Sequence, residues 1–436
     1  MAAKNLAASG VLYTDRRDFY IDPQVVKELW TDVAPFTTVL SNKETRQTND
    51  PVFKMFEHRN PWVKQEFSSA TDVASQAADD TESDVMDVDG ITGLNSSCDA
   101  SWLGLIADVW NEDKDTKRGQ VMVSSITDSN TIKFKVIGSA AIDVADNDVF
   151  VVVGNAQGEG TEAPEAWADE LQVCWNSCQI FKTPLEITGT LLQASLRGES
   201  SELARLRLQK NQEHKMQKEK AFLYGVRIGG TNLGDNLSSS SDDAFADGGR
   251  TDVANSALVR TTYGIVSAIE DFGTSSGDDQ SVYTVSSTYK YGDFVDDMEK
   301  VFQYVPTNGV KRAFCGAGAL GYWSKMAGSE GFAGGSGWTV NLSDMKRDTL
   351  GFNYKILETP HGILQLIPTP ALRGPNNKYM LIIEEDNLFH SQYRSPMYQT
   401  NIKTNNAYDG VKDQYFSDEG IGITLIESHN LFKITA

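Results

Sequence analysis

Hydrophobic and polar positions follow a helical pattern most clearly over residues 200–224. This stretch contains neither proline nor glycine, and residues that favour helices dominate it. Ser200 and Ser201 can cap its first turn, and Gly225 follows its last residue, as is typical of a helix end. We therefore predict a helix of about 25 residues, roughly 37 Å long at 1.5 Å per residue.

The middle of this helix, from Arg207 to Lys220, has almost no apolar stripe. A helix that is polar nearly all round crosses a surface or bridges two layers rather than filling a core. The stretch is also basic, with six lysines and arginines against three glutamates. Two interpretations stay open. One is a solvated helix with pairs such as Lys215–Glu219; the other is a helix lying on an acidic surface of its own chain or of a neighbour.

Alternating patterns before the helix predict strands. Over residues 100–155 they predict three to five short strands in a small sheet or barrel-like module. Residues 50–66 contain two prolines and indicate an edge strand or an irregular hairpin arm. Residues 68–90, rich in Ser, Ala and Asp, predict a flexible exposed loop, and residues 156–170 an acidic connector.

The two ends of the chain differ in pattern. Residues 1–45 predict an extended arm with one short helix that ends at residues 34–36, followed by a strand-like run at 37–40. Residues 230–252 read as a long loop. Beyond it we predict helices at 253–272 and 291–304, and strands at 310–315, 354–357, 363–367, 378–384, 423–426 and 431–434. We expect the last strand to close the sheet that the long helix covers.

Composition narrows the possible functions. The 436 residues suffice for two or three domains, and a formal net charge of −21 argues against a basic nucleic-acid binder. The sequence shows no signal peptide and no apolar run of about 20 residues. The four cysteines, Cys98, Cys174, Cys178 and Cys315, do not have the density of a disulfide framework, which indicates a reducing compartment.

Metal sites find little support. Cys174 and Cys178 are spaced to share one helical face, but a zinc site needs two more ligands and no histidine is near in sequence. Small buried cysteines are the favoured interpretation. In the acidic stretch, Gly90 does not sit at position six of a calcium loop. We predict no metal site.

Residues Gly316 to Gly321 match G-x-G-x-x-G after a strand-like run, and Asp344 lies at a suitable distance for a dinucleotide site. However, the glycines between residues 328 and 337 should end the following helix after about two turns. A turn that opens a short structural helix is favoured, and a nucleotide-dependent enzyme is the minor alternative. Other catalytic motifs are missing, so we predict no catalytic or cofactor-binding residues and no enzyme activity.

Residues 176–225 carry a resemblance. Asn176, then Gln-Ile-Phe, then Thr-Gly-Thr and a polar helix closing in Leu-Tyr-Gly are similar to the major capsid proteins of tailed bacteriophages, as is the tail at 408–434. This resemblance implies an α+β fold of the Hong Kong 97 type. It divides the chain into an N-terminal arm (1–49), an extended β loop with an inserted β module (50–180), a peripheral domain with its spine helix at 200–224 (181–252), an axial domain (253–375) and a return to the peripheral domain with closing strands (376–436).

The resemblance also implies a function. The chain would be a structural subunit that self-assembles into hexamers and pentamers of an icosahedral head around double-stranded DNA, without sequence-specific DNA binding. It would be assembled in the bacterial host cytoplasm and end in the virion, with no membrane partner. Because the chain runs from Met1 almost directly into the arm, scaffolding would be a separate protein; portal and decoration proteins are further expected partners. An encapsulin-type nanocompartment shell is the alternative within the same fold.

The arm and extended loop cannot bury their own apolar residues and need neighbouring subunits. We therefore name eight candidate inter-subunit contacts: Trp30, Trp62, Trp102, Trp110, Arg205, Arg207, Lys210 and Lys215. Each tryptophan has the alternative of ordinary packing within its own module. The basic spine helix is expected to face acidic extended loops of adjacent subunits. The lysines of the extended loop give no basis for assigning a covalent crosslink.

Overall fold

The computed structural model describes residues 34–43, 45–58, 65–77, 81–92, 94, 97–160, 171–194, 201–227, 259–275, 280–304, 309–333, 346–347, 353–402 and 409–435. The chain forms two compact units, one of Met1–Glu57 with Val173–Ala436 and one of His58–Gln172. The smaller unit consists mainly of strands, and the larger unit contains both helices and strands. The predicted α+β fold is confirmed. No described helix is long and apolar enough to cross a membrane.

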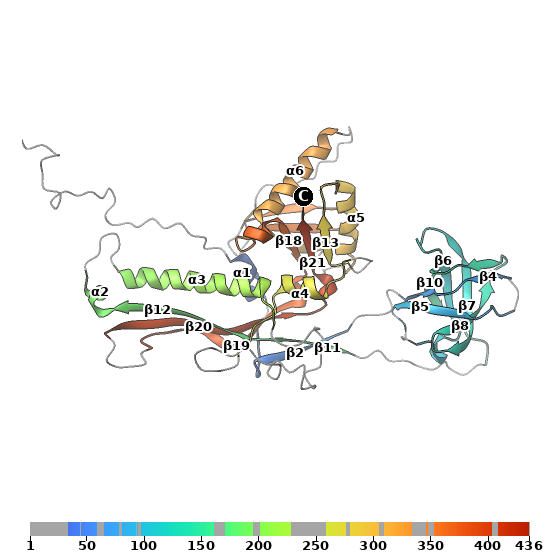
Figure 1. The fold of residues 1–436 in the computed structure, drawn as a ribbon, viewed down its shortest axis with the longest axis horizontal. Helices are drawn as coiled ribbons and strands as arrows, with labels where there is room; N and C mark the ends of the chain where they lie inside the picture. The colour runs from blue at the N-terminus through green and yellow to red at the C-terminus, as the bar shows by residue number, and fades with distance from the viewer. Residues whose placement is uncertain are drawn as a thin grey trace, which may run out of the picture. The chain divides into compact units, whose positions relative to one another are not determined.

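The smaller unit is built around a closed barrel with strand order β10-β3-β5-β8-β7-β6 (Figure 1). Its strands are β3 (Glu66–Ser69), β5 (Met86–Thr92), β6 (Leu105–Trp110), β7 (Lys117–Asp128), β8 (Thr131–Ile137) and β10 (Val149–Asn155). Alternate side chains such as Val121, Val123 and Phe134 fill the barrel, and Phe67 stacks on Phe150 at 4.9 Å. The predicted barrel-like module is confirmed.

The predicted loop at residues 68–90 is wrong in its described parts. Strands β3 and β5 close the barrel, and β4 (Val73–Gln76) pairs with β9 (Ile142–Val144). The acidic composition concealed an alternation in which Met86 and Val88 are buried while Asp87 and Asp89 are exposed.

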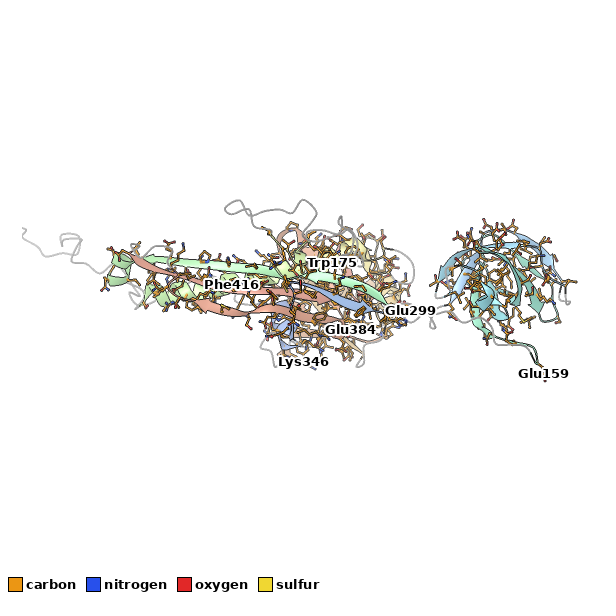
Figure 2. All side chains as sticks on the ribbon, turned by 90° about the horizontal axis from the view of Figure 1, so that it is seen from below. Glu159, Trp175, Glu299, Lys346, Glu384 and Phe416 are labelled. Atoms are coloured by element: carbon orange, nitrogen blue, oxygen red, sulfur yellow. The ribbon has the colours of Figure 1, made fainter. Side chains whose placement is uncertain are left out.

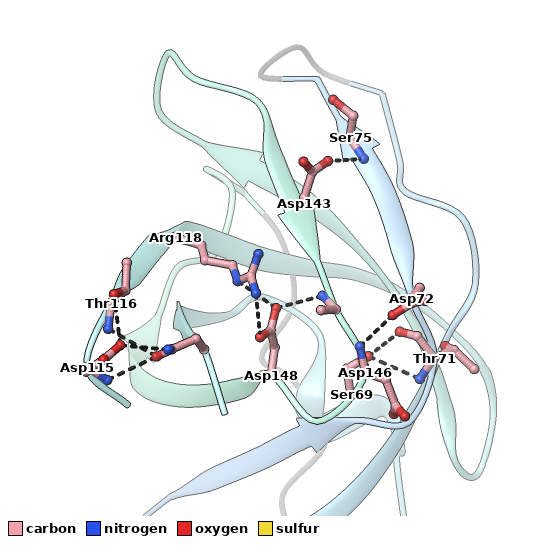
Figure 3. A network of polar contacts seen from close by, with 12 residues as sticks. Ser69, Thr71, Asp72, Ser75, Asp115, Thr116, Arg118, Asp143, Asp146 and Asp148 are labelled. Atoms are coloured by element: carbon pink, nitrogen blue, oxygen red, sulfur yellow. Dashed lines mark hydrogen bonds and ion pairs between the residues drawn. The ribbon is translucent and has the colours of Figure 1, made fainter. Parts of the chain in front are cut away.

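Polar contacts fasten this β4–β9 side of the barrel (Figure 3). The Asp146 amide donates to Asp72 Oδ1 at 2.7 Å, and Arg118 Nε lies 2.8 Å from Asp148 Oδ2. Asp148 is buried, and its Oδ2 also accepts the Ala145 amide. These carboxylates hold loops in place, so their role is structural.

The larger unit contains a four-stranded sheet with order β1-β19-β20-β12. Its strands are β1 (Thr45–Gln47), β12 (Gln179–Thr188), β19 (Leu388–Gln399) and β20 (Gly410–Ile423). The long helix α3 (Glu202–Tyr224) runs along one face, with the short helices α1 (Pro35–Asn42) and α2 (Gly189–Gln193) nearby (Figure 1). The predicted helix at 200–224 is therefore confirmed to within two residues.

A seven-stranded sheet, order β13-β21-β18-β14-β17-β16-β15, forms the rest of this unit together with α4 (Ile265–Phe272), α5 (Tyr291–Val301) and α6 (Ala317–Ala333). Its strands are β13 (Val282–Val285), β14 (Val310–Cys315), β15 (Lys346–Arg347), β16 (Asn353–Glu358), β17 (Ile363–Pro368), β18 (Tyr379–Ile383) and β21 (Asn430–Ile434). Alternate residues of β14 enter two cores: Phe314 packs with the α1 and α4 side, Ala313 and Cys315 with the α5 and α6 side. A further pair, β2 (Val52–Glu57) and β11 (Gln172–Ser177), completes the unit.

Several local predictions need correction. Residues 37–40 belong to α1 rather than a strand, because Pro35 starts a helix and Phe36, Val39 and Leu40 form its buried face. Cys174 and the residues before Cys178 lie on β11, so the two thiols do not share a helical face. All four cysteines are free and buried, as favoured.

The ends of other helices and strands also differ from the predicted ones. The helix predicted at 253–272 covers only α4 in its described part, because residues 259–264 are not helical. Strand β20 ends at Ile423, and a 3-10 turn follows at Ile426–Ser428. Helix α6 runs for 17 residues through its glycines, against the expected two turns. The predicted helix before residue 34 and the loop at 230–252 lie outside the described residues.

The C-terminal strand was placed in the wrong sheet. Strand β21 pairs with β13 and β18 in the seven-stranded sheet, whereas α3 covers β12 and β20. After residue 376 the chain therefore alternates between the sheets: β18 in one, β19 and β20 in the other, then β21 back in the first. The predicted boundary at residue 375 between the axial domain and the peripheral return does not coincide with the division of the strands between the two sheets.

Candidate functional site: a buried polar layer under the long helix

Helix α3 lies on β20, and the inward-facing polar residues of the two elements follow one another at similar spacings. Its inward residues Arg207, His214 and Lys218 are spaced by about 10 Å and 6 Å along the helix axis. The alternate residues Asp413, Ser417 and Glu419 of β20 are spaced by about 13 Å and 7 Å. The two rows pair in order, so a polar layer replaces the usual apolar one between helix and sheet.

Asp413 anchors one end of this layer. Its side chain is completely buried, and Arg207 Nη2 lies 2.9 Å from Oδ2. The Asn401 amide donates to Oδ1 at 2.8 Å, and the Tyr398 hydroxyl donates to Oδ2. Burial alone would raise the pKa of Asp413, but the donors from Tyr398, Asn401 and Arg207 hold that pKa below its ordinary value. The carboxylate is therefore ionised at neutral pH.

His214 forms the middle of the layer and joins the helix to two strands. Its Nδ1 lies 3.0 Å from Thr183 Oγ1 on β12, and its Nε2 lies 3.0 Å from Ser417 Oγ on β20. Burial, assisted by the nearby Lys218 ammonium, lowers the pKa of His214 to about 4. The imidazole is neutral at pH 7 and acts as a hydrogen-bonding bridge.

Glu419 closes the layer at the other end. Lys218 Nζ lies 3.1 Å from Oε2, and His390 Nε2 of β19 lies 3.4 Å from the same oxygen. Burial opposes ionisation, but contact with His390 and Lys218 keeps the pKa of Glu419 below its ordinary value. Each buried carboxylate of the layer therefore pairs with a cation of α3: Asp413 with Arg207, and Glu419 with Lys218. These pairs stand where a helix with a continuous apolar face would make apolar contacts.

Glu219 adds a contact with α1. Its carboxylate accepts the Phe36 amide at 3.1 Å, the Thr37 amide at 2.7 Å and the Thr37 hydroxyl at 2.6 Å. These amides belong to the first turn of α1, where backbone donors lack partners and the helix dipole favours an anion. Burial nevertheless raises the pKa of Glu219, against the effect of these hydrogen bonds.

These contacts decide between the two interpretations of the polar helix in favour of the second, because α3 lies on an acidic surface of its own chain. The proposed pair Lys215–Glu219 is wrong, because Glu219 points to α1. Arg207 is bound to the buried Asp413, while 38% of its own side chain stays exposed. Asp413 and Glu419 were not predicted from the sequence; charged residues alternating along an otherwise strand-like tail were the available signal.

The other candidate contacts are scattered. Trp102 is buried within the barrel unit, 5.1 Å from the ring of Phe67, so we withdraw it as an interface anchor. Trp110 is half-buried, and Lys215 is exposed. Arg205 pairs with Glu202, and Lys210 pairs with Glu213 at 2.7 Å, both on α3 itself. Trp30 and Trp62 lie outside the described residues.

The glycine motif after β14 serves packing within the chain. The Gly318 amide donates to Asn377 Oδ1 at 3.0 Å, and a Cβ on Gly316 would lie 2.2 Å from the Asn377 carbonyl oxygen. The backbone thus approaches the 3-10 turn Gly374–Lys378, where a dinucleotide site would need room for a pyrophosphate. Among described residues, no group of three or more His, Cys, Asp or Glu is placed to hold a metal ion.

Comparison with known proteins identifies the family. A profile described as SU10 major capsid protein matches residues 24–421, nearly the whole chain. A comparison with curated protein sequences finds no significant match.

Comparison with solved structures finds distant matches, three of which follow. The capsid of a native GTA particle is 10% identical, covers 99% of this chain and 100% of its own, and has a TM-score of 0.43. Microbacterium phage Oxtober96 is 11% identical with coverages of 98% and 96% and a TM-score of 0.37. The holo-SrpI encapsulin complex from Synechococcus elongatus PCC 7942 is 7% identical with coverages of 63% and 76% and a TM-score of 0.37.

The family match confirms the resemblance to tailed-phage capsid proteins that residues 176–225 indicated. The match covers both units, the polar layer and most of β20. The chain belongs to the SU10 major capsid protein family and has a structural role in a viral capsid.

Proposed function

We propose that this chain is the shell-forming subunit of a phage head, that it assembles into hexamers and pentamers, and that it does so without catalysis. The family match over residues 24–421 carries the proposal, because it spans both units rather than one domain. The polar layer under α3 supports a mechanical role. Buried, hydrogen-bonded charges hold a long helix in one register on its sheet, and a shell subunit needs a stiff element of this kind.

Enclosed DNA is the proposed content of the shell. The formal net charge of −21 makes the subunit repel the phosphate backbone, so packaged DNA would not adhere to the wall. Sequence-specific binding is not part of the proposal. Assembly in the host cytoplasm, a separate scaffolding protein, a portal and decoration proteins belong to the same proposal as expected context.

The division into arm, extended loop, peripheral and axial domains stays a proposal, with the seven-stranded sheet as the axial part. The proposed inter-subunit contacts are Trp30, Trp62, Trp110, Arg205, Arg207, Lys210 and Lys215. Lys215 is exposed on α3, and Arg205 and Lys210 lie on the same helix with partly exposed side chains, which suits contacts at the rim of an interface.

Negative-stain microscopy of the purified protein, combined with sedimentation velocity, tests the function. Closed shells, or rings of five or six subunits, are the expected result. Because some shells need an assembly partner, the same measurement is repeated after co-expression with neighbouring phage structural genes. A small oligomer without curved assemblies in both experiments would contradict the proposal.

A further inference from the structure

The barrel unit carries most of the negative charge of the chain. Residues 58–172 contain 22 aspartates and glutamates against seven lysines and arginines, a net charge of −15 out of −21 for the whole chain. Two copies of so acidic a unit repel each other unless the surfaces that meet are complementary. The distribution of charged and apolar side chains over the outside of the barrel therefore decides which sides of two copies fit together.

One side of the barrel is apolar on its outer surface. Residues paired directly across antiparallel strands share a face. Val149 of β10 pairs with Trp110 of β6, and Ile106 of β6 pairs with Met122 of β7. Their neighbours along the strands are buried in the barrel, so these four half-buried side chains point outward. Side chains project outward from the strands of this unit as well as into it (Figure 2).

Strand β10 adds two further valines to this surface. Val151 pairs with Asp108 of β6 on the same outer face. The register of the two strands then shifts between Val152 and Gly154, and Val153 at this bulge is 61% exposed. None of these outward residues belongs to the buried cluster inside the barrel. We define the apolar side as Ile106, Trp110, Met122, Val149, Val151 and Val153.

Lysines border the apolar side. Lys114 Nζ lies 2.8 Å from Glu66, and Lys117 Nζ lies 2.6 Å from Asp108. The lysine side chains are 40% and 43% exposed, whereas each carboxylate side chain is only 18% exposed. Lys135 of β8, which pairs with β7, adds a third lysine at the edge. Within an acidic unit, this side therefore presents apolar groups and cations to its surroundings.

The opposite side of the barrel is acidic. In the closed order β10-β3-β5-β8-β7-β6, strand β5 lies across the barrel from β6. Four exposed carboxylates on and just before β5 make no ion pair within the described part of the unit. Val85, in the same run, is 44% exposed. We define the acidic stripe as Glu82, Asp84, Asp87 and Asp89.

We propose that the apolar side of one barrel docks on the acidic stripe of the barrel of a second copy. The inference rests on the proposed self-assembly and names one of its contacts. The exposed lysines of one copy meet carboxylates that lack a cation in the other, and the apolar side covers the exposed Val85. A basic partner of another kind would match only the stripe and leave the apolar side and its lysines without a complement.

The position of the two surfaces predicts how the copies are arranged. They differ from each other and lie on opposite sides of the barrel, so the contact is heterologous and repeats from copy to copy. Such a contact closes into a ring when the copies are arranged about an axis, as in the proposed hexamers and pentamers. A two-fold contact between like surfaces would instead bring two lysine borders or two acidic stripes together.

The contact is small. Six apolar residues and a few charges are well below the roughly 20–30 residues a side of a standard interface. Docking of the barrels is therefore not expected to hold two free chains together. It adds stability once other contacts place the copies in a ring, because the effective concentration of one barrel at the next is then high.

Charge reversal in the full-length chain tests the docking. One variant reverses the lysine border (Lys117→Glu with Lys135→Glu), and another reverses the stripe (Asp84→Lys with Asp87→Lys). Rings and shells are counted by negative stain and sedimentation velocity at low ionic strength. We expect each variant to lose at least about tenfold in the association constant for ring formation, which corresponds to about 1.4 kcal/mol.

Recovery identifies the partner surface. Both reversals in one chain should restore rings of five and of six, because each reversed border then meets a reversed stripe on the next copy. An equal mixture of the two single reversals should restore only rings of six. In such a ring the two variants alternate, whereas a ring of five must contain one mismatched contact. Two surfaces on opposite sides of one barrel cannot meet within a chain, so recovery by the double reversal requires two copies.

The controls reverse exposed charges on the larger unit: Glu299→Lys on α5 and Lys325→Glu on α6, both expected to assemble like the wild type. Circular dichroism and thermal unfolding establish that each variant is folded. If Lys117→Glu disturbs the barrel beside Asp108, Val153→Asp replaces the border variant, since this side chain is largely exposed at a bulge. It should weaken ring formation in the same direction.

The outcomes separate the two proposals. Folded border and stripe variants that assemble like the wild type would overturn the docking and leave the proposed function intact. Loss in both variants without recovery in the double reversal would also overturn it, since the two surfaces would not be partners. A wild-type chain that forms neither rings nor shells, even after co-expression with neighbouring phage structural genes, would overturn the proposed function itself.

Discussion

Glu219 of α3 accepts both the backbone amide and the hydroxyl of Thr37, at 2.7 Å and 2.6 Å. These residues are 182 positions apart, and the contact caps the first turn of α1 from outside the helix. Because no α1 side chain supplies this cap, the position of α1 depends on α3. The long helix thereby organises the chain on two sides: α1 through Glu219 and β20 through the polar layer.

Glu219→Ala tests this capping. We expect the variant to lose about 1–3 kcal/mol of stability, because three donors that are buried with Glu219 lose their acceptor. Hydrogen exchange of the Phe36 and Thr37 amides should speed up selectively. Glu213→Gln, on the exposed side of α3, is the matched control and should change neither quantity. Unchanged exchange at Thr37 in Glu219→Ala would contradict the capping role.

His214 predicts a pH dependence of stability. Its pKa is lowered to about 4 in the folded chain, so between pH 6.5 and 4 the unfolded chain binds a proton that the folded chain does not. Stability must therefore fall as pH falls through this window, by about 1.4 kcal/mol per pH unit for this residue. His429, with a pKa lowered to about 3, contributes a slope of the same sign.

His214→Gln should remove the His214 share and retain hydrogen bonding to Thr183 and Ser417. Urea unfolding at pH 6.5, 5.5 and 5.0 measures the slope for variant and wild type, and the difference isolates His214 from the other titrating groups. Equal slopes would show that the pKa of His214 is not lowered in the folded chain, and would contradict its role as a buried neutral bridge.

Asp413→Asn tests the ion pair with Arg207. The substitution keeps the shape but removes the charge, and we expect a loss of about 1–3 kcal/mol, typical of hydrogen bonds to charged groups. Arg207→Met combined with Asp413→Asn should cost less than the sum of the single changes. The control is Glu186→Gln, whose partner Lys412 is 3.6 Å away with both side chains largely exposed. Its effect should stay below about 1 kcal/mol. Additive effects at Arg207 and Asp413 would argue against the pair.

Alanine substitutions at two glycines of the G-x-G-x-x-G segment are expected to change stability in opposite directions. At Gly316 an added Cβ would collide with the backbone of Asn377, so Gly316→Ala should destabilise the larger unit. At Gly321, inside α6, nothing lies within 4 Å, so Gly321→Ala should be neutral or stabilise by up to about 1 kcal/mol. Thermal unfolding compares the two. Neither chain is expected to bind nicotinamide dinucleotides; saturable binding lost in Gly316→Ala would revive the enzyme alternative.

Local pattern was sufficient where neighbouring residues decide the structure. Helix α3 and strands β7, β8 and β14 were predicted because propensity and alternation act over a few positions. Strand β5 was missed because its exposed aspartates masked the buried Met86 and Val88. The family resemblance of residues 176–225 depended on the same kind of short-range information, and it was confirmed.

Most of the elements, the acidic character of the chain and its kinship with capsid proteins could thus be predicted from the sequence alone. Which charges are neutralised depends on the fold. Arg207 and Lys210 look alike in sequence, yet Arg207 faces a buried aspartate and Lys210 an exposed glutamate. The sheet that receives β21 was predicted wrongly from the sequence, because strand pairing joins segments far apart in the chain. Coulomb and hydrogen-bond energies depend on distance in space and on burial, and neither quantity can be read from spacing along the chain.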